Sequence, residues 1–118
     1  MAFTTGPIEN LGNQPANANR VRVKILNRTA GPLTGVVRVF RLDGSIVLIE
    51  QVNFNVNSNA STIETLSLVH PAFGQALEYE VQIVPNQPGG LYSVYGITAE
   101  SVIITAQCVV NAELTQFL

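Results

Sequence analysis

The chain has 118 residues, of which 47% are hydrophobic and 12% charged, and its formal net charge is −2. This length suits one domain that buries about two-thirds of its unfolded surface, and the abundant Val, Ile and Leu exclude intrinsic disorder. The near balance of acidic and basic residues argues against nucleic-acid binding, which requires an excess of positive charge. The charged fraction is about half the usual share of about 25%, so neutral Asn, Gln, Ser and Thr must cover much of the surface.

The first 19 residues, MAFTTGPIENLGNQPANAN, are rich in Asn, Pro and Gly. Their composition predicts a flexible N-terminal arm or connector over residues 1–19, followed by a β-sandwich domain over residues 20–118. Phe3, Ile8 and Leu11 are spaced along this arm, and we expect them to dock in a groove of a neighbouring subunit. The segment has neither a basic n-region nor an apolar h-region, so the sequence predicts no classical secretory signal.

Alternation of apolar and polar residues, the period of a half-buried strand, dominates the rest of the chain. It predicts eight strands, within residues 20–26, 36–42, 46–56, 61–69, 78–85, 91–97, 101–110 and 112–117. Residues 27–35 are typical of a loop, residues 70–76 of a connection, and Asp43-Gly44 of a type I′ hairpin turn. Short strands between Gly, Pro and Asn turns predict a single all-β antiparallel β-sandwich or jelly roll, whose strand order stays open.

Residues 101–112 carry no charge and are rich in Val and Ile. A strand of this kind at an open sheet edge would invite aggregation. We therefore expect it to be central in its sheet or covered by another chain. Cys108, the single cysteine, shares an alternating face with Ile104 and Val110, which favours a buried, inert thiol over an intersubunit crosslink.

Charged residues are sorted into two rows: Arg20, Arg22 and Lys24 line one strand, and Glu78 and Glu80 line another. If these strands are neighbours, the rows pair across strands at about 0.2–1 kcal/mol per pair. If they are not, the rows are candidate subunit-interface charges, complementary stripes that set the register between copies. The usual weakness of surface ion pairs favours a third interpretation, a locally neutralised solvent face.

Catalytic, cofactor-binding and metal-binding motifs are absent from the sequence. His70 is the single histidine and Asp43 the single aspartate, and no serine lies in a G-x-S-x-G elbow, so a catalytic triad has no support. The ligand spacings of zinc and calcium sites and the Gly-rich phosphate loops are also missing. Tyr92 and Tyr95, beside the turn at residues 86–90, suggest a carbohydrate-stacking patch, although their spacing places at least one of them in the core.

Three segments resemble a known group of proteins: FTTGPIENLG-x-x-P, then V-R-V-x-I/L-x-N, then VRVFRLDGS. Together they resemble small β-sandwich proteins of endospore-forming Firmicutes, some of which are associated with the spore surface. In size, β content and N-terminal arm, the chain is also similar to subunits of endospore appendages, the pilus-like fibres on spores. Those subunits are jelly rolls whose N-terminal connectors reach into neighbours and whose strands augment each other. Their connectors typically carry cysteines, and residues 1–19 contain none, so a fibre of this chain would be non-covalent at that contact.

The most favoured function is therefore a structural subunit that assembles non-covalently into a fibre or coat, on the spore surface or outside the cell. Its partners would be further copies of itself and other spore-surface proteins, with no nucleic acid, no cofactor and no membrane span. The alternative function is an adhesion module that binds glycans or a surface through its loops. An enzyme is the least favoured class, and a monomer of another role also stays open.

Overall fold

The computed structural model describes residues 1–12 and 16–117. All eight expected strands form, with boundaries within a few residues of those predicted. They are β3 (Arg20–Asn27), β4 (Leu33–Arg41), β5 (Val47–Val56), β6 (Ala60–Ser67), β9 (Glu78–Pro85), β10 (Gly90–Ile97), β11 (Ile103–Val109) and β12 (Thr115–Phe117). Shorter elements are β1 (Ala2–Thr4), β2 (Ile8–Glu9), β7 (Val69–His70), β8 (Gly74–Gln75) and the 3₁₀ turn η1 (Asn111–Glu113).

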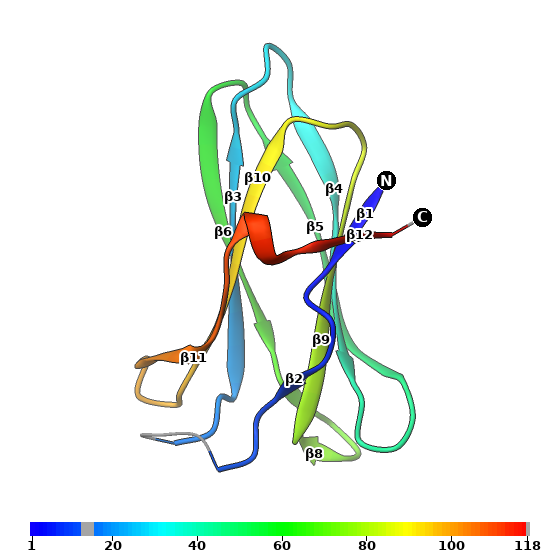
Figure 1. Ribbon diagram of the computed structural model, residues 1–118, viewed down its shortest axis with the longest axis vertical. Coiled ribbons are helices and arrows are strands. Elements are labelled where there is room, and N and C mark those ends of the chain that lie inside the picture. Colours follow the sequence, from blue (N-terminus) through cyan, green and yellow to red (C-terminus); the bar gives the residue numbers. More distant parts are fainter. Residues whose placement is uncertain (13–15, 118) are drawn as a thin grey trace.

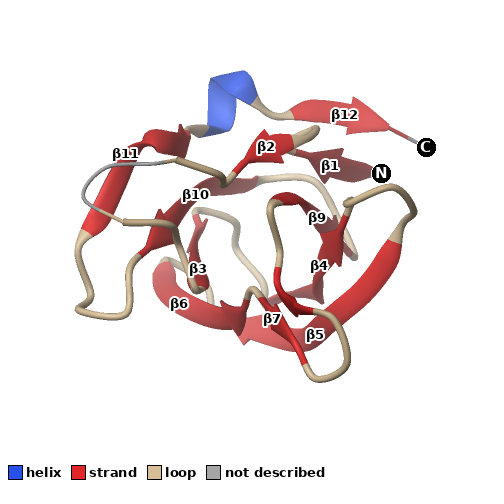
Figure 2. Cartoon of the chain, turned by 90° about the horizontal axis from the view of Figure 1, so that it is seen from below, coloured by secondary structure: helices blue, strands red, loops and turns tan. Residues whose placement is uncertain are grey.

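The strands form two antiparallel sheets that pack face to face, which confirms the all-β sandwich (Figures 1 and 2). The larger sheet has the order β12-β1-β9-β4-β5, and β2 also pairs with β9. The smaller sheet has the order β11-β10-β3-β6, and β7 pairs with β8 in a separate small ribbon. Because β4 returns antiparallel to β3 and pairs antiparallel with β9, the strands β3 and β9 run in the same direction in opposite sheets (Figure 1).

The core lies between the sheets and comes from the alternation seen in the sequence. On β3 the buried side chains are Val21, Val23 and Ile25, and on β9 they are Tyr79, Val81 and Ile83. The polar or charged residues between them point to the two outer faces. Burial of each such aliphatic side chain stabilises the fold by about 1.5–3 kcal/mol.

The Asp43-Gly44 pair lies in a hairpin loop between β4 and β5, as predicted, but the turn type was predicted incorrectly. A type I′ turn needs a positive φ at both central residues, and only Gly44 of this pair has one, at 93°. The loop is longer than two residues because a shift of register between Val39 and Phe40 changes how β4 meets β5.

The N-terminal segment does not stand apart from the sandwich in this chain. β1 lies between β9 and β12, with Phe3 opposite Ile83 and Thr4 opposite Gln82. The pairing is supported by apolar burial, because Ala2 is buried and Phe3 packs against the core. Residue 20 is therefore no boundary between an arm and a domain here, although residues 13–15 of the expected arm lie outside the described residues.

Candidate functional site

The four edge strands are β12 and β5 of the larger sheet and β11 and β6 of the smaller sheet. Three of them carry features that discourage pairing with another chain. β12 has only three residues, and short edge strands are poor templates. β5 and β6 are in contact with each other, and Glu50 on β5 accepts a hydrogen bond from the Ser67 backbone N–H on β6 at 2.7 Å. Glu50 and Glu64 also place negative charge on these two edges, which further opposes pairing.

The fourth edge strand, β11, carries neither a charge nor a proline. It has seven residues and, within the described part of the chain, pairs only with β10. The sequence predicted that this uncharged segment would be central or covered, and the structure excludes a central position. Ile103 at the start of β11 is 50% exposed, and the flanking Val102 and Val110 are 44% and 49% exposed, so apolar side chains at both ends of the strand are left in contact with water.

Cys108 is exposed on this edge, so its predicted burial was wrong. The physical reason is a shift of register between β10 and β11, where Gly96 lies opposite Ile104 but Val94 lies opposite Val109. The extra residues of β11 reverse the alternation, and Gln107 turns inward in place of Cys108. A strictly alternating strand would have buried the thiol.

A groove of about 460 Å³ runs beside the exposed side of β11. Its walls include Ala106 and Val109 of β11 and, from the N-terminal segment, Pro7, Ile8 and Leu11. The groove places a strand that is paired on one side only next to apolar side chains. This is the arrangement in which another β-strand gains both backbone hydrogen bonds and apolar contacts.

The three residues expected to dock on a neighbour are divided by the structure. Phe3 and Ile8 are half-buried and pack against the core of their own chain, and the Phe3 and Tyr92 ring centroids are 5.6 Å apart. Leu11 is 60% exposed. Phe3 and Ile8 therefore occupy sites on their own chain and not on a neighbour. Leu11 is the one of the three that can still contact another subunit.

A buried polar cluster holds the N-terminal segment, and the sequence interpretation missed it. The Tyr79 hydroxyl donates to Gln107 Oε1 at 2.6 Å, and Gln107 Nε2 donates to Asn10 Oδ1 at 2.8 Å. Asn10 Nδ2 in turn donates to the carbonyls of Ala18 and Ala76 at 2.8 and 2.9 Å. Asn10, Gln107 and Tyr79 are almost fully buried. A glutamine inside an uncharged Val/Ile-rich strand was the available signal.

Burial alters the pKa of both core tyrosines. Desolvation raises the pKa of Tyr79 far above its ordinary value, and it raises the pKa of Tyr92 to about 12. Both hydroxyls therefore stay protonated at neutral pH, so Tyr79 can act as the donor in the cluster. Tyr92 faces the core and Tyr95 lies beneath Lys24, whose Nζ is 5.6 Å from the ring centroid. Neither ring presents a free face for stacking a sugar.

The two rows of charge lie on opposite outer faces of the sandwich. Arg20, Arg22 and Lys24 belong to β3 of the smaller sheet, and Glu78 and Glu80 belong to β9 of the larger one. Cross-strand pairing between the rows within one chain is thereby excluded. Within the described residues, no ion pair joins any of the five to an opposite charge.

The contacts that the rows do make are to neutral groups. Arg20 donates to the Thr98 carbonyl at 3.4 Å and to the Ser101 hydroxyl at 3.2 Å, while Glu80 accepts from the Thr4 hydroxyl. Hydrogen bonds of this kind orient a side chain without cancelling its charge. The sequence favoured local neutralisation of these charges by opposite charges. Among the described residues, no ion pair to either row supports that interpretation.

An apolar hollow of about 540 Å³ lies on the outer face of the smaller sheet, at the end of the basic row. Leu26, Ile63 and Leu91 line it, with Lys24 and Asn111 at its border. Ile63 is 53% exposed and Leu91 is 42% exposed. The face thus carries both positive charge and uncovered apolar surface.

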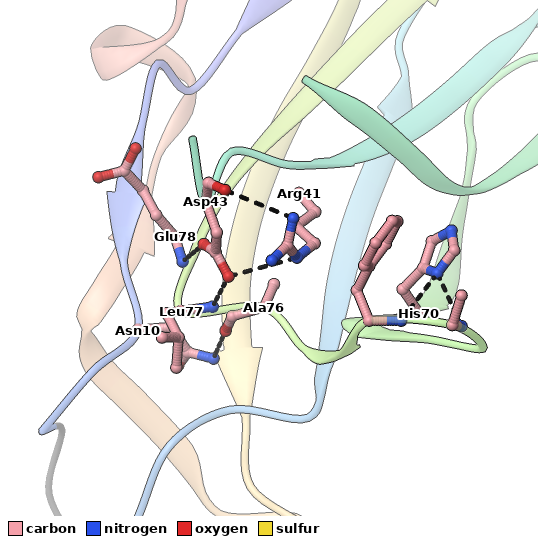
Figure 3. A network of polar contacts seen from close by, with 9 residues as sticks. Asn10, Arg41, Asp43, His70, Ala76, Leu77 and Glu78 are labelled. Carbon is pink, nitrogen blue, oxygen red and sulfur yellow. Dashed lines mark hydrogen bonds and ion pairs between the residues drawn. The ribbon is translucent and has the colours of Figure 1, made fainter. Parts of the chain in front are cut away.

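The residues considered for catalysis make structural contacts (Figure 3). Asp43 accepts hydrogen bonds from the Leu77 and Glu78 backbone N–H groups at 3.0 and 2.8 Å, and its carboxylate is 3.4 Å from Arg41 Nε. It thereby fastens the β4–β5 loop to the start of β9. His70 Nδ1 accepts from the Ala72 N–H at 2.9 Å and so closes its own loop.

Two kinds of structural feature are absent from the described residues. No group of three or more His, Cys, Asp or Glu side chains there is arranged to hold a metal ion. No helix among the described residues is long and apolar enough to cross a membrane.

Comparison with known proteins finds no matching family model and no matching curated protein. Two solved structures are similar to the chain. Thermotoga maritima 1070 has 12% sequence identity over 86% of this chain and 84% of its own, with a TM-score of 0.49. The Anabaena sensory rhodopsin transducer has 16% identity over 80% of this chain and 93% of its own, with a TM-score of 0.45. At these levels neither structure indicates a function for this chain.

Proposed function

We propose that this protein is a structural subunit that assembles with copies of itself, and that the β11 edge is where one copy meets another. The observation that carries the proposal is the contrast between this edge and the other three. β5 and β6 carry Glu50 and Glu64, β12 is short, and β11 alone is long and uncharged. Proteins that remain single normally protect such an edge with charge, proline or a covering segment.

Pairing of β11 with β11 of a second copy gives the free backbone N–H and C=O groups of both edges hydrogen-bond partners. Antiparallel pairing of a strand with itself is isologous, since each copy offers the same surface to the other. It joins the two four-stranded sheets into one continuous sheet and covers exposed apolar side chains such as Ile103 and Val110. The backbone hydrogen bonds supply affinity, and the groove beside Ala106 and Val109 receives side chains of the partner strand.

A lysine in the middle of this edge should prevent the pairing. We expect Ala106→Lys to abolish the dimer that pairs through this edge, because an edge lysine opposes strand pairing and antiparallel self-pairing brings the two lysines together. Ala99→Lys, in the exposed turn before β11, adds the same charge away from the edge and should assemble like the wild type. Light scattering after size exclusion, with negative-stain microscopy at high concentration, gives the readout. Wild-type chains that remain single at high concentration would contradict the proposed function.

The N-terminal segment enters the proposal as an exchangeable element. Its contacts with β9 are brief, namely Phe3 and Thr4 opposite Ile83 and Gln82, and Ile8 and Glu9 opposite Tyr79 and Glu78. The same positions on β9 can accept this segment from a second copy. Such an exchange replaces contacts within one chain by identical contacts between two chains, so its energetic cost is low. We propose that in the assembly this segment docks on a neighbour through the contacts that it makes here within one chain.

A disulfide can record whether this exchange occurs. Thr4 and Gln82 lie opposite each other on β1 and β9, within the reach of a cross-strand cystine. In a Cys108→Ser background, exchange between the two copies of the β11-paired dimer predicts that oxidation of assembled Thr4→Cys/Gln82→Cys chains gives covalent dimers on a non-reducing gel. The same pair in the Ala106→Lys background should give single chains with an internal bond. Single chains from assembled material would disprove the exchange but leave β11 pairing intact.

A further inference from the structure

We infer that the outer face of the smaller sheet docks on the outer face of the larger sheet of a second copy, with the β3 row of one against the β9 row of the next. This inference rests on the proposed self-assembly and names a second contact, separate from the β11 edge. It follows from three properties of the two faces: their charge, the order of residues along the two rows and the position of the apolar hollow.

The two faces are opposite in charge. On the smaller sheet, Arg20, Arg22 and Lys24 point outward, and the β6 and β10 residues opposite them in the ladder are uncharged. On the larger sheet, Glu78 and Glu80 point outward, with Glu9 opposite Glu78. Arg38 is also on this face and donates to Gln51 at 3.2 Å, toward the β5 side. Charge of one sign therefore meets charge of the other when the faces are brought together.

The residues of the two rows follow the same order. Both β3 and β9 have eight residues whose outward positions alternate with buried ones. With the strands parallel, Arg20 meets Glu78 and Arg22 meets Glu80. Lys24 then meets Gln82, and Leu26 meets Val84. Outward side chains on any strand repeat about every 6.6–6.8 Å, so all four pairs can form in one register.

The apolar hollow falls at the matching end of the rows. Leu26 lines it on the basic face, and Val84 occupies the equivalent position on the acidic face, beside Val36 on β4. Val36 and Val84 are both half-exposed in the single chain. Docking in this register sets these two valines against Ile63 and Leu91 and removes apolar surface of both copies from water.

The geometry of the fold lets copies dock this way by translation alone. Because β3 and β9 run in the same direction within one chain (Figure 1), a second copy in the same orientation presents its β9 parallel to β3 when the two faces meet. The contact is heterologous, since different faces meet, and it can be repeated without closing. Sheets pack about 10 Å apart, so the stack should repeat about every 20 Å, two sheet spacings.

Reversal of charge on one face at a time tests this contact. Arg20→Glu/Arg22→Glu makes both faces acidic, and Glu78→Lys/Glu80→Lys makes both faces basic, so each variant alone should lose every particle larger than the β11-paired dimer. Mixed in equal amounts, the two variants should recover long particles that alternate between them, because each now offers what the other lacks. Analytical ultracentrifugation and negative-stain microscopy in low salt measure both effects, and rising salt should shorten the particles.

Arg28→Glu is the control, since it reverses one charge of the same sign at an exposed loop residue off the face, and it should assemble like the wild type. Either double variant forming particles of wild-type length would overturn the face contact, and so would the absence of recovery on mixing of folded variants. In both cases a persistent dimer that Ala106→Lys abolishes would leave the proposed function standing. Wild-type chains that never associate would overturn both.

Discussion

Replacement of Gly35 by alanine should lower the free energy of unfolding by about 3 kcal/mol, which corresponds to a fall of about 10 °C in melting temperature for a domain of this size. Gly35 lies in β4 opposite Phe54 and Pro85. A Cβ at this position would be 2.4 Å from the Val84 carbonyl oxygen, 2.7 Å from Phe54 Cζ and 2.8 Å from Pro85 Cα. Two of these atoms are backbone of the neighbouring strand and cannot rotate away.

The matched control is Gly31→Ala, in the loop before β4, where a new Cβ would meet nothing within 4 Å. That substitution should change stability by less than about 0.5 kcal/mol. Urea denaturation followed by circular dichroism compares the two variants directly. Equal stability of the two would show that β4 and β9 can separate at Gly35 without cost, contrary to the close approach described above.

Replacement of Gln107 by leucine should lower the free energy of unfolding by about 2–3 kcal/mol, although the side chain becomes more apolar. The substitution leaves the buried Tyr79 hydroxyl without its acceptor at 2.6 Å and removes a donor to Asn10. An unsatisfied buried polar group costs about 1–3 kcal/mol. Gln116→Leu, on the exposed part of β12, should be nearly neutral by comparison.

A double-mutant cycle separates the hydrogen bond from simple repacking. Adding Tyr79→Phe to Gln107→Leu removes both partners, so the double variant should be more stable than Gln107→Leu alone. Two additive losses in thermal or urea unfolding would show that the cluster acts as three separate side chains rather than as a network.

Strict alternation explains how much of the fold could be predicted from the sequence. β3 and β9 show it without interruption, and their cores and outer rows are where the pattern placed them. Alternation says nothing about which strands are neighbours, because that depends on contacts far apart in the chain. The sequence thus identified the charge rows, but only the structure shows that they lie on opposite faces.

The misses have a shared physical cause in local departures from regular geometry. The register shift in β11 moved Cys108 outward and Gln107 inward, and no period of two can indicate where such a shift falls. Gly35 was assigned to a loop because glycine is common there, whereas in the strand it makes room for Phe54. The N-terminal segment has a composition typical of a linker, yet Asn10 is buried and donates to the carbonyls of Ala18 and Ala76.

Because β11 is the single long and uncharged edge among the described strands, it also limits how many copies can join by strand pairing in the proposed assembly. A subunit with two free edges can add copies at both, without limit, and such growth leads toward cross-β aggregates. Here one edge is used up in the first pairing event, and the opposite edge of the same sheet is blunted by Glu50 at the Ser67 N–H. Strand pairing therefore stops at two copies, so any longer particle must grow through the faces, whose screened charges make that growth reversible by salt.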